Sequence, residues 1–371
     1  MTGSHAAGLT PLRVLLAGGG TAGHVEPAMS LAEALERRRP VAITALGTAT
    51  GLEATLVPAR GYDLRLIPRV PLPRRPSLDL VSLPVRLRGA VRAARAVIDS
   101  VQPHVVVGFG GYVALPAYLA ARRAGVPIVV HEANARAGMA NRIGARFTQF
   151  VAVSTPDSTL AHGQLTGIPL RRAVATLNRA NERKAARLEW GLDPERSTLL
   201  VFGGSQGAAR INNAMSAAAT QLLARGIQVL HVVGPGNEVD VPSTAGLPPY
   251  VVVPYIDHMD RAYAAADLVL CRSGAMTCAE LAAVGLPGVF VPYPHSNGEQ
   301  ELNAAPMVAA GAGLLIADAE LTGTQIIESV APLLEDRERL SLMSERASTL
   351  GYPDADERLV DMVLEAAGRR P

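Results

Sequence analysis

Two glycine-rich segments, residues 18–24 and 203–208, could bind a phosphate or a sugar. Each follows an apolar run, residues 13–17 and 199–202 respectively, and each precedes a helical pattern. Glycine lets the backbone turn sharply and approach a ligand closely, and the free N–H groups at a helix start attract anionic oxygens. The sequence therefore predicts two anion-binding turns, one in each half of the chain.

His24 directly follows the first of these segments, beside Thr21 and Gly23. We expect the helix to open at Pro27, so that its N-terminus lowers the pKa of His24 and keeps the imidazole neutral, as a general base requires. A histidine that merely contacts its own loop is the alternative. We favour the catalytic interpretation because the neighbouring residues lie on a ligand-facing turn.

A second polar group, comprising His131, Glu132 and Asn134, follows the apolar run 128–130. Open α/β sheets bind ligands at the carboxyl ends of their strands, which is where these side chains fall. The Asn134 amide can donate and accept at once, which suits a sugar hydroxyl, although it could equally hold its own loop.

The segment 271–280 runs from a strand into a helix and carries the more specific motif of the second half. Glu280 shares a helix face with Met276 and Thr277, four and three residues earlier. Its carboxylate could accept both hydroxyls of a ribose, whereas a salt bridge or a helix cap is the alternative. A polar cluster that would suit a sugar follows the run ending at Val291 and comprises His295, Glu299, Gln300 and Asn303.

The first segment also fits a dinucleotide-binding pattern, GxGxxG, through Gly18, Gly20 and Gly23. An NAD enzyme needs an acid at the end of the second strand to hold the ribose. Residues 45–48, Ala-Leu-Gly-Thr, contain no carboxylate. We therefore disfavour NAD binding.

The composition describes a globular α/β protein of two domains. The 371 residues exceed the usual size of one core, and 49% are hydrophobic, 18% charged and 4% aromatic, which excludes a disordered chain. Cys271 and Cys278 form no CxxC pair, so we expect a reduced compartment and no structural zinc. Residues 1–10 do not resemble a signal peptide. Glycines and prolines interrupt both long uncharged runs, residues 100–121 and 281–298, so we expect no transmembrane helix.

Short apolar runs alternate with helical patterns in both halves, which indicates parallel βαβ units in two doubly wound sheets. Gly167 and Pro169 interrupt the pattern, so we expect one domain over residues 1–168 and a second over 169–350. A last helix within residues 351–371 could return to the first domain. The expected strands are residues 13–17, 41–46, 105–107, 128–130, 150–153, 199–202, 229–233, 251–253, 268–271 and 288–291, and the expected helices include residues 89–100, 115–124, 181–190 and 357–367.

The net charge of +2 hides an asymmetry between the two halves. Residues 1–170 carry 18 basic and 9 acidic side chains, a charge of +9, and the remainder carries 17 basic and 24 acidic side chains, a charge of −7. A basic first half could meet nucleic acid, an anionic membrane or an anionic substrate. Nucleic acid is the least favoured, because aromatic residues are scarce and the arginines lie beside leucines.

Arginines and apolar residues interleave between Arg60 and Arg95. This stretch holds nine arginines and two acids, Asp63 and Asp79. The pattern fits peripheral binding to an anionic lipid surface, and the alternative is an amphipathic helix packed on the sheet with its charges in water. We favour membrane contact because of the charge asymmetry. The apolar members are Leu78, Leu80, Val81, Leu83, Val85 and Leu87.

Five segments, in this order, resemble the motifs of the MurG family of glycosyltransferases over nearly the whole chain. They are residues 19–24 (Gly-Gly-Thr-Ala-Gly-His), 108–112 (Gly-Phe-Gly-Gly-Tyr), 131–134 (His-Glu-Ala-Asn), 203–208 (Gly-Gly-Ser-Gln-Gly-Ala) and 271–280. Members of this family act in bacterial cell-wall synthesis. They transfer N-acetylglucosamine (GlcNAc) from its UDP donor to undecaprenyl-diphospho-muramoylpentapeptide.

The resemblance implies a GT-B fold, in which two Rossmann-like domains face an interdomain cleft. The first would hold the acceptor and the second most of UDP-GlcNAc. The implied acceptor site comprises Gly19, Gly110, Gly111 and Tyr112. The implied donor contacts are Thr21, Ala22, Gly23 and Asn134 for the GlcNAc side, Arg171 and Ser205 for the diphosphate, and the Ile256 backbone for uracil. The remaining ones are Ala275, Met276 and Thr277 for the nucleotide, Glu280 for the ribose, and Gln300 and Asn303 for the sugar hydroxyls.

The implied chemistry is an inverting displacement, in which the muramoyl 4-hydroxyl attacks the anomeric carbon and UDP leaves. His24 would be the base, and Arg171 with the amides of the second loop would stabilise the diphosphate. We expect no cofactor and no essential metal, because the one Asp-x-Asp sequence, residues 354–356, lies away from every loop. The resemblance places the protein peripherally at the cytoplasmic face of the cell membrane, with partners among cell-wall and division proteins.

Three residues depart from the family pattern. Glu26 stands where an aromatic is common, Ile168 replaces a polar residue, and Glu299 occupies a position often filled by glutamine. We therefore rank Gln300 above Glu299 as a sugar contact. Two alternatives stay open: another UDP-sugar enzyme of this fold, such as a UDP-GlcNAc 2-epimerase, and a non-catalytic sugar-nucleotide sensor or membrane scaffold.

Overall fold

The computed structural model describes residues 10–70, 79–241, 243, 245–295 and 298–368. Contacts divide the chain into two compact units. Unit 1 comprises Met1–Arg171 and Asp354–Pro371, and unit 2 comprises Arg172–Pro353. The division therefore falls three residues after the boundary expected from the sequence, and the last helix is counted with unit 1.

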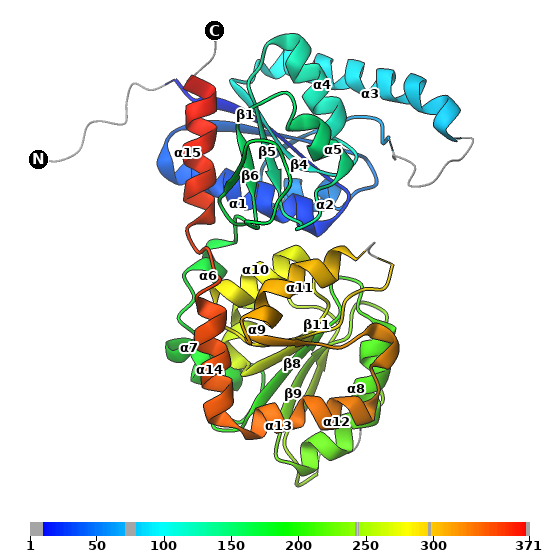
Figure 1. Ribbon diagram of the computed structural model, residues 1–371, viewed down its shortest axis with the longest axis vertical. Helices are drawn as coiled ribbons and strands as arrows, with labels where there is room; N and C mark the ends of the chain where they lie inside the picture. Colours follow the sequence, from blue (N-terminus) through cyan, green and yellow to red (C-terminus); the bar gives the residue numbers. More distant parts are fainter. Residues whose placement is uncertain (1–9, 71–78, 242, 244, 296–297, 369–371) are drawn as a thin grey trace, which may run out of the picture. The chain divides into compact units, whose positions relative to one another are not determined.

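Unit 1 is built on a parallel sheet with the strand order β3-β2-β1-β4-β5-β6-β7. Its strands are β1 (Leu12–Gly18), β2 (Val41–Gly47), β3 (Asp63–Leu66), β4 (Val105–Gly110), β5 (Ile128–Glu132), β6 (Val151–Val153) and β7 (Gly163–Leu165). Its helices, labelled in part in Figure 1, are α1 (Ala22–Arg38), α2 (Glu53–Ala59), α3 (Asp79–Val101), α4 (Ala114–Ala124), α5 (Met139–Gly144) and α15 (Ala355–Gly368).

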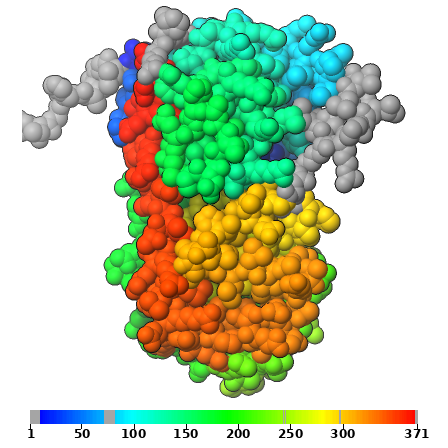
Figure 2. Space-filling view, viewed as in Figure 1, coloured from blue at the N-terminus to red at the C-terminus, as the bar shows by residue number. Residues whose placement is uncertain are grey.

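Both faces of this sheet are covered, so its central strands are largely apolar. In β1, Val14 and Leu16 pack with α1 and α15, whereas Leu15 and Ala17 pack with α3 and α4. Successive side chains of a strand point to opposite faces of the sheet, so β1 contributes alternately to the two hydrophobic cores. Figure 2 shows α15, in red, with one flank at the molecular surface.

The first helix begins earlier than the sequence predicts. We expected it to open at Pro27, but Thr21 is the N-cap and α1 runs from Ala22, with Pro27 buried inside it. Gly20, at a φ of 90°, completes the turn out of β1, so the chain can enter the helix at once. His24 therefore lies in the first turn of α1 rather than in the loop before it.

Unit 2 repeats the architecture with the parallel strand order β10-β9-β8-β11-β12-β13. Its strands are β8 (Thr198–Phe202), β9 (Gln228–Val232), β10 (Tyr250–Val253), β11 (Leu268–Cys271), β12 (Gly288–Phe290) and β13 (Gly313–Leu315). Its α-helices are α6 (Arg172–Ala175), α7 (Arg179–Glu189), α8 (Ala209–Ala224), α9 (Met259–Ala265), α10 (Ala275–Ala283), α11 (Glu299–Ala309), α12 (Gly323–Ser329), α13 (Ala331–Glu335) and α14 (Arg337–Ser348).

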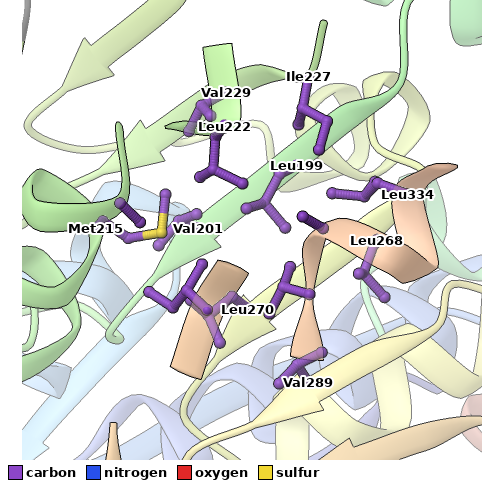
Figure 3. Packing of buried hydrophobic residues seen from close by; sticks show 14 of the residues in the cluster. Leu199, Val201, Met215, Leu222, Ile227, Val229, Leu268, Leu270, Val289 and Leu334 are labelled. Carbon is purple, nitrogen blue, oxygen red and sulfur yellow. The ribbon is translucent and has the colours of Figure 1, made fainter. Parts of the chain in front are cut away.

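The core of unit 2 lies between its sheet and the helices α8, α12, α13 and α14. Figure 3 shows Leu199 and Val201 of β8 close to Leu268 and Leu270 of β11, with Met215 of α8 beside them. All five side chains are fully buried. This packing fixes the ends of β8 and β11, from which the second glycine-rich loop and α10 emerge.

Candidate functional site

Each sheet has one point at which the strand order reverses. In unit 1 this point lies between β1 and β4, and the glycine turns that follow these two strands lie against each other. A Cβ on Gly111, which has a φ of 77°, would collide with the carbonyl oxygen of Gly19. Open α/β sheets bind ligands outside the carboxyl ends of the strands at this reversal. The predicted acceptor residues Gly19, Gly110 and Gly111 therefore lie together in the two contacting turns at the β1–β4 reversal.

His24 is oriented by the backbone of the first glycine turn. Its Nδ1 lies 3.1 Å from the Gly19 carbonyl oxygen and 3.1 Å from Thr21 Oγ1. Because a carbonyl can only accept, Nδ1 carries the proton of the neutral ring and Nε2 is left as the basic nitrogen. A Cβ on Gly110 would stand 3.1 Å from Nε2, so the glycine there keeps this side of the ring uncrowded.

Burial lowers the pKa of His24 below its ordinary value. Glu132, the Gly19 carbonyl and Glu53 act in the opposite direction but do not outweigh the burial. The direction agrees with the sequence-based prediction. The cause is different, because we had attributed the shift to the dipole of a helix starting after His24. The ring is consequently neutral at neutral pH.

Glu53 was missed by the sequence analysis and is the residue that holds the first glycine turn. Its side chain is fully buried at the start of α2, and Oε2 accepts from the Gly20 N–H at 2.7 Å. Oε1 accepts from the backbone N–H and the hydroxyl of Thr48, at 2.8 and 2.9 Å. Burial raises the pKa of this carboxyl, but the hydrogen bonds from Gly20 and Thr48 outweigh it and leave the pKa lowered.

The glycines around Glu53 give the sequence signal that could have identified it. A Cβ on Gly19 would stand 2.7 Å from Oε1, and a Cβ on Gly47 or Gly51 would collide with the Glu53 side chain. The pattern Gly-Thr-x-x-Gly-x-Glu over residues 47–53 thus indicates a buried carboxylate surrounded by backbone, because the glycines leave room for it. This acid contacts the glycine loop itself, six residues after the end of β2.

The second polar group of unit 1 forms a buried network after β5. Glu132 accepts from the backbone N–H of Asn134 at 3.0 Å, from its amide at 3.4 Å, and from the Asn141 amide at 3.0 Å. Asn141 in turn accepts from the Tyr118 hydroxyl at 2.7 Å. The Asn134 side chain therefore contacts its own loop, which was the alternative to sugar binding that the sequence left open.

His131 lies in β5, and Tyr112 follows β4. His131 is fully buried with Nε2 3.1 Å from the Gly167 carbonyl oxygen, and burial lowers its pKa to about 4. Tyr112, a predicted acceptor residue, lies 3.6 Å from the position of a Cβ on Gly20, and the Arg69 guanidinium lies 4.4 Å above its ring. The structure thus brings Tyr112 to the first glycine turn. Arg171 is half-buried at the end of the first of the two segments that form unit 1.

In unit 2 the strand order reverses between β8 and β11. Ser205 is exposed in the loop between β8 and α8, and Ala275, Met276 and Thr277 form the first turn of α10, directly after β11. Gly204 has a φ of 100°, which a side chain would make costly, so the loop needs glycine there. Two helix N-termini and four predicted donor residues follow the strands at this reversal.

The predicted ribose and sugar residues follow on α10 and α11. Glu280 is 7% exposed, and its Oε2 accepts from the Tyr263 hydroxyl at 2.7 Å, which orients the carboxylate. Gln300 accepts from the Tyr293 N–H at 2.9 Å, and the Asn303 amide lies 3.4 Å from the Ser273 carbonyl oxygen. Ile256, predicted to contact uracil, is 6% exposed in the segment after β10.

Among the described residues no group of three or more His, Cys, Asp or Glu side chains could hold a metal ion. The carboxylates of the Asp-x-Asp sequence pair with arginines instead: Asp354 with Arg358 at 2.9 Å, and Asp356 with Arg37. In the part of the chain that the structure covers, no helix combines the length and apolar character needed to span a membrane.

Two family models match the chain. The N-terminal domain of glycosyltransferase family 28 matches residues 14–153, and the C-terminal domain of that family matches residues 198–359. The curated UDP-N-acetylglucosamine–N-acetylmuramyl-(pentapeptide) pyrophosphoryl-undecaprenol N-acetylglucosamine transferase of Streptomyces avermitilis is 59% identical over 361 residues, covering 97% of this chain and 99% of the relative.

Solved structures show the same likeness. The crystal structure of Acinetobacter baumannii MurG superposes with a TM-score of 0.78 at 28% identity, covering 96% of this chain and all of that one. The UDP-GlcNAc 2-epimerase of Neisseria meningitidis, bound to UDP-GlcNAc, shares the fold with a TM-score of 0.65 at 16% identity, covering 95% and 100% of the two chains. On these matches the chain has the α/β fold of the GT-B glycosyltransferases and belongs to the MurG family within glycosyltransferase family 28.

Proposed function

We propose that the protein transfers GlcNAc from UDP-GlcNAc to the muramoyl 4-hydroxyl of undecaprenyl-diphospho-muramoylpentapeptide, with inversion at the anomeric carbon. The observation that carries this proposal is the 59% identity, over nearly full length, to a transferase of that name. The oriented, neutral His24 at the β1–β4 reversal supports it independently.

In this mechanism Nε2 of His24 takes the proton from the attacking hydroxyl. Its competence follows from the Gly19 carbonyl, which holds the proton on Nδ1, and from burial, which keeps the ring neutral. As the attack proceeds the ring becomes positive, and the nearby Glu132 and Glu53 carboxylates stabilise that charge. The UDP leaving group gains charge on its diphosphate, for which we assign Arg171, Ser205 and the free N–H groups of α8.

The donor contacts are assigned residue by residue on the family motifs. Unit 1 contributes Thr21, Ala22, Gly23 and Asn134, and unit 2 contributes Ile256, Ala275, Met276, Thr277, Glu280, Gln300 and Asn303. We assign the acceptor to Gly19, Gly110, Gly111 and Tyr112. The hydrogen bond between Glu280 and Tyr263 supports a ribose contact, because it fixes one carboxylate oxygen on the helix whose first turn carries Ala275, Met276 and Thr277.

We further propose that unit 1 meets the cytoplasmic face of the cell membrane peripherally, where a lipid-linked acceptor would be found. Val85 on α3 is 71% exposed and Leu66 is 53% exposed, and Arg65, Arg88 and Arg92 are exposed as well. Residues 71–78, including Arg74, Arg75 and Leu78, lie outside the described residues, and the side chains of Leu80 and Val81 are not described. Partners among cell-wall and division proteins remain part of this proposal.

The test is a radiolabelled UDP-GlcNAc transfer assay with a lipid I analogue as acceptor. We expect a disaccharide product from the wild type, a loss of kcat in His24→Ala and a loss of donor affinity in Glu280→Ala. His162→Asn is the control for His24→Ala, since His162 is exposed in the same unit and its φ of 61° suits asparagine.

Three results would contradict the proposal. Interconversion of free UDP-sugars without transfer would indicate a 2-epimerase. Full function in His24→Ala would favour the sensor or scaffold. Equal use of UDP-GlcNAc and UDP-glucose would remove the donor assignment.

A further inference from the structure

A cationic cavity lies in unit 2 at the end of the sheet opposite the proposed donor residues. It has a volume of about 430 Å³ and is lined by residues that precede β8 and β11, such as Ser197 and Asp267, together with α7 and α14. Ser205 and Ala275, in contrast, follow the carboxyl ends of these same strands. Since a parallel strand has its two ends at opposite edges of the sheet, this cavity is separate from the proposed nucleotide site.

Cations outnumber carboxylates among the described residues that line this cavity. The carboxylates are Glu195, Asp267 and Glu345. The cations, which we call the arginine pocket, are Arg179, Arg183, Lys184, Arg187, Arg196 and Arg337. The lining therefore carries three more cations than carboxylates, and one of these cations, Arg196, pairs with Asp193 outside the lining at 3.2 Å.

Two of these arginines already form hydrogen bonds within the protein. Arg179 donates to the carbonyl oxygens of Tyr263, Gly285 and Ala266, at 3.2, 2.7 and 2.6 Å. Arg187 donates to the Ala265 carbonyl at 2.9 Å and pairs with Asp267 at 2.6 Å. They attach α7 to the strands and helices beside it, and they keep two positive charges fixed at the base of the pocket.

Arg183 lies one helical turn from each of them and is far less satisfied. Its Nη2 lies 3.5 Å from Asp267 Oδ1, and its Nε is buried without a hydrogen-bond partner. Asp267 already serves Arg187, so one carboxylate faces two guanidinium groups. Burial first, and then repulsion from Arg183 and Arg187, lowers the pKa of Arg179 to about 10, against which Asp267 acts only in part. The positive charge in the pocket is thus under-compensated.

We propose that the arginine pocket binds a phosphate group, held chiefly by Arg183 and Lys184 with Arg196 and Arg337 at its rim. A compact oxyanion with two or more charges matches the excess charge of the lining and the planar donors of a guanidinium. Lys184 is exposed beside Arg183 and can turn toward the anion. The phosphate could belong to a soluble molecule or to a lipid headgroup, since both present the same oxygens.

The test uses the full chain with saturating UDP, so that any nucleotide site is already occupied. Inorganic phosphate and pyrophosphate are titrated against chloride at constant ionic strength, and the melting temperature and the heat of binding are followed. We expect a saturable rise in melting temperature for the wild type. Arg183→Gln and Lys184→Gln should each weaken the apparent affinity tenfold or more.

Arg339→Gln is the matched control, because Arg339 is exposed on α14, loses the same charge and does not line the cavity. Lys184→Gln keeps the test valid if Arg183→Gln is unstable, since Lys184 is a surface residue. Co-sedimentation with phosphatidylglycerol vesicles then assigns the source: a loss specific to Arg183→Gln indicates a headgroup, and unchanged sedimentation indicates a soluble phosphate. A response to phosphate that does not saturate, or that is equal in Arg183→Gln and Arg339→Gln, would overturn the proposal.

Discussion

A single backbone carbonyl determines what His24 can do. The Gly19 oxygen, 3.1 Å from Nδ1, leaves Nε2 as the proton acceptor. Because burial lowers the pKa of His24 from its ordinary value of 6.5, the ring becomes half-protonated only below pH 6.5. We expect the acidic decline in kcat/KM to have its midpoint below pH 6.5, where the base becomes protonated.

This prediction is checked by measuring kcat/KM for the acceptor between pH 5 and 8, a profile that reports groups of the free enzyme. His24→Ala should lower kcat by a factor on the order of 10² to 10⁴, as for the loss of a general base. It should also remove the acidic decline. A decline with its midpoint above pH 6.5, or one that survives in His24→Ala, would exclude His24 as the base.

Glu53→Gln tests the carboxylate that holds the first glycine turn. The new amide would point N–H groups at either the Gly20 or the Thr48 donors, which leaves buried donors unpaired and costs about 1–3 kcal/mol of unfolding free energy. The lost charge also removes a contribution that raises the pKa of His24, so the acidic decline should move to lower pH.

Urea unfolding and the pH profile together measure these two effects of Glu53→Gln. Glu338→Gln, an exposed glutamate in the first turn of α14, is the control and should change neither. A stable Glu53→Gln protein with an unchanged profile would show that Glu53 does not position the turn.

At this scale the sequence predicted the glycine loops and the histidine beside them, but not the residues that hold them in place. Glycine loops and the histidine beside them follow from local pattern, because their roles depend on neighbours in the chain. Glu53 contacts a glycine 33 residues earlier, and Asn141 contacts Tyr118 and Glu132, so both pairings depend on strand order. Burial of His24 depends equally on distant residues, which is why the direction of its shift was predicted and its cause was not.

The two glycine turns of unit 1 act as one element, and Gly111→Ala would separate them. Gly111 and Gly125 have similar φ values, 77° and 66°, but a Cβ collides with the Gly19 carbonyl only at Gly111 and meets nothing at Gly125. Both substitutions incur the left-handed cost of about 1–2 kcal/mol. Only Gly111→Ala should also displace the Gly19 carbonyl and lower transferase activity.

Comparing kcat/KM with the unfolding free energy in the two alanine variants separates backbone strain from displacement of the turn. Equal activity losses would mean that strain alone accounts for both.

Helix α15 is joined to unit 1 by its apolar face, although it is the last element of the chain. Leu359 and Val363 are fully buried in the same core as Val14 and Leu35. We expect Leu359→Ala to cost about 2–5 kcal/mol of unfolding free energy, because it leaves a cavity in a packed core. Asp361→Ala, which removes an exposed pair with Arg38, should cost less than about 1 kcal/mol.

Urea denaturation, followed by a probe in unit 1, provides the measurement for this pair of variants. Similar midpoints for Leu359→Ala and Asp361→Ala would mean that α15 contributes little to the stability of unit 1.

The elements that the sequence predicted share long apolar runs, and those it missed do not. The central strands of both sheets are buried on two faces and are rich in Val and Leu, whereas β3, β7 and β13 are short edge strands. In β3, Asp-Leu-Arg-Leu, three of the four residues are exposed, and β7 begins with glycine. These segments are strands only because they form hydrogen bonds with a neighbouring strand, and the local sequence does not predict those bonds. The start of α1 was misplaced because Pro27, a common helix opener, lies inside the helix here.

The whole molecule combines two sheets of the same topology with opposite net charge. The repeated alternation of strands and helices made the two sheets predictable, and the reversal of strand order puts a glycine turn at the same place in each. The basic half carries the exposed arginines of α3, whereas the acidic half contains the arginine pocket as a local exception. The net charge of each half therefore determines its attraction to a large charged surface such as a membrane. The arrangement of individual side chains determines which small anion it could bind.

Membrane binding is the prediction that belongs to this largest scale. Arginines near an anionic surface contribute about 1 kcal/mol each, and exposed apolar side chains add insertion. We expect the protein to sediment with phosphatidylglycerol vesicles more than with phosphatidylcholine vesicles, and less as salt is raised, since salt screens the attraction.

Val85→Glu puts a negative charge at a side chain that is 71% exposed on α3, and should weaken this binding. Leu342→Glu, on α14 with 48% exposure, should leave it unchanged. Equal binding to both vesicle types, or equal losses in the two variants, would favour the alternative. In that case α3 is an amphipathic helix packed on the sheet, and its arginines lie in water without binding lipid.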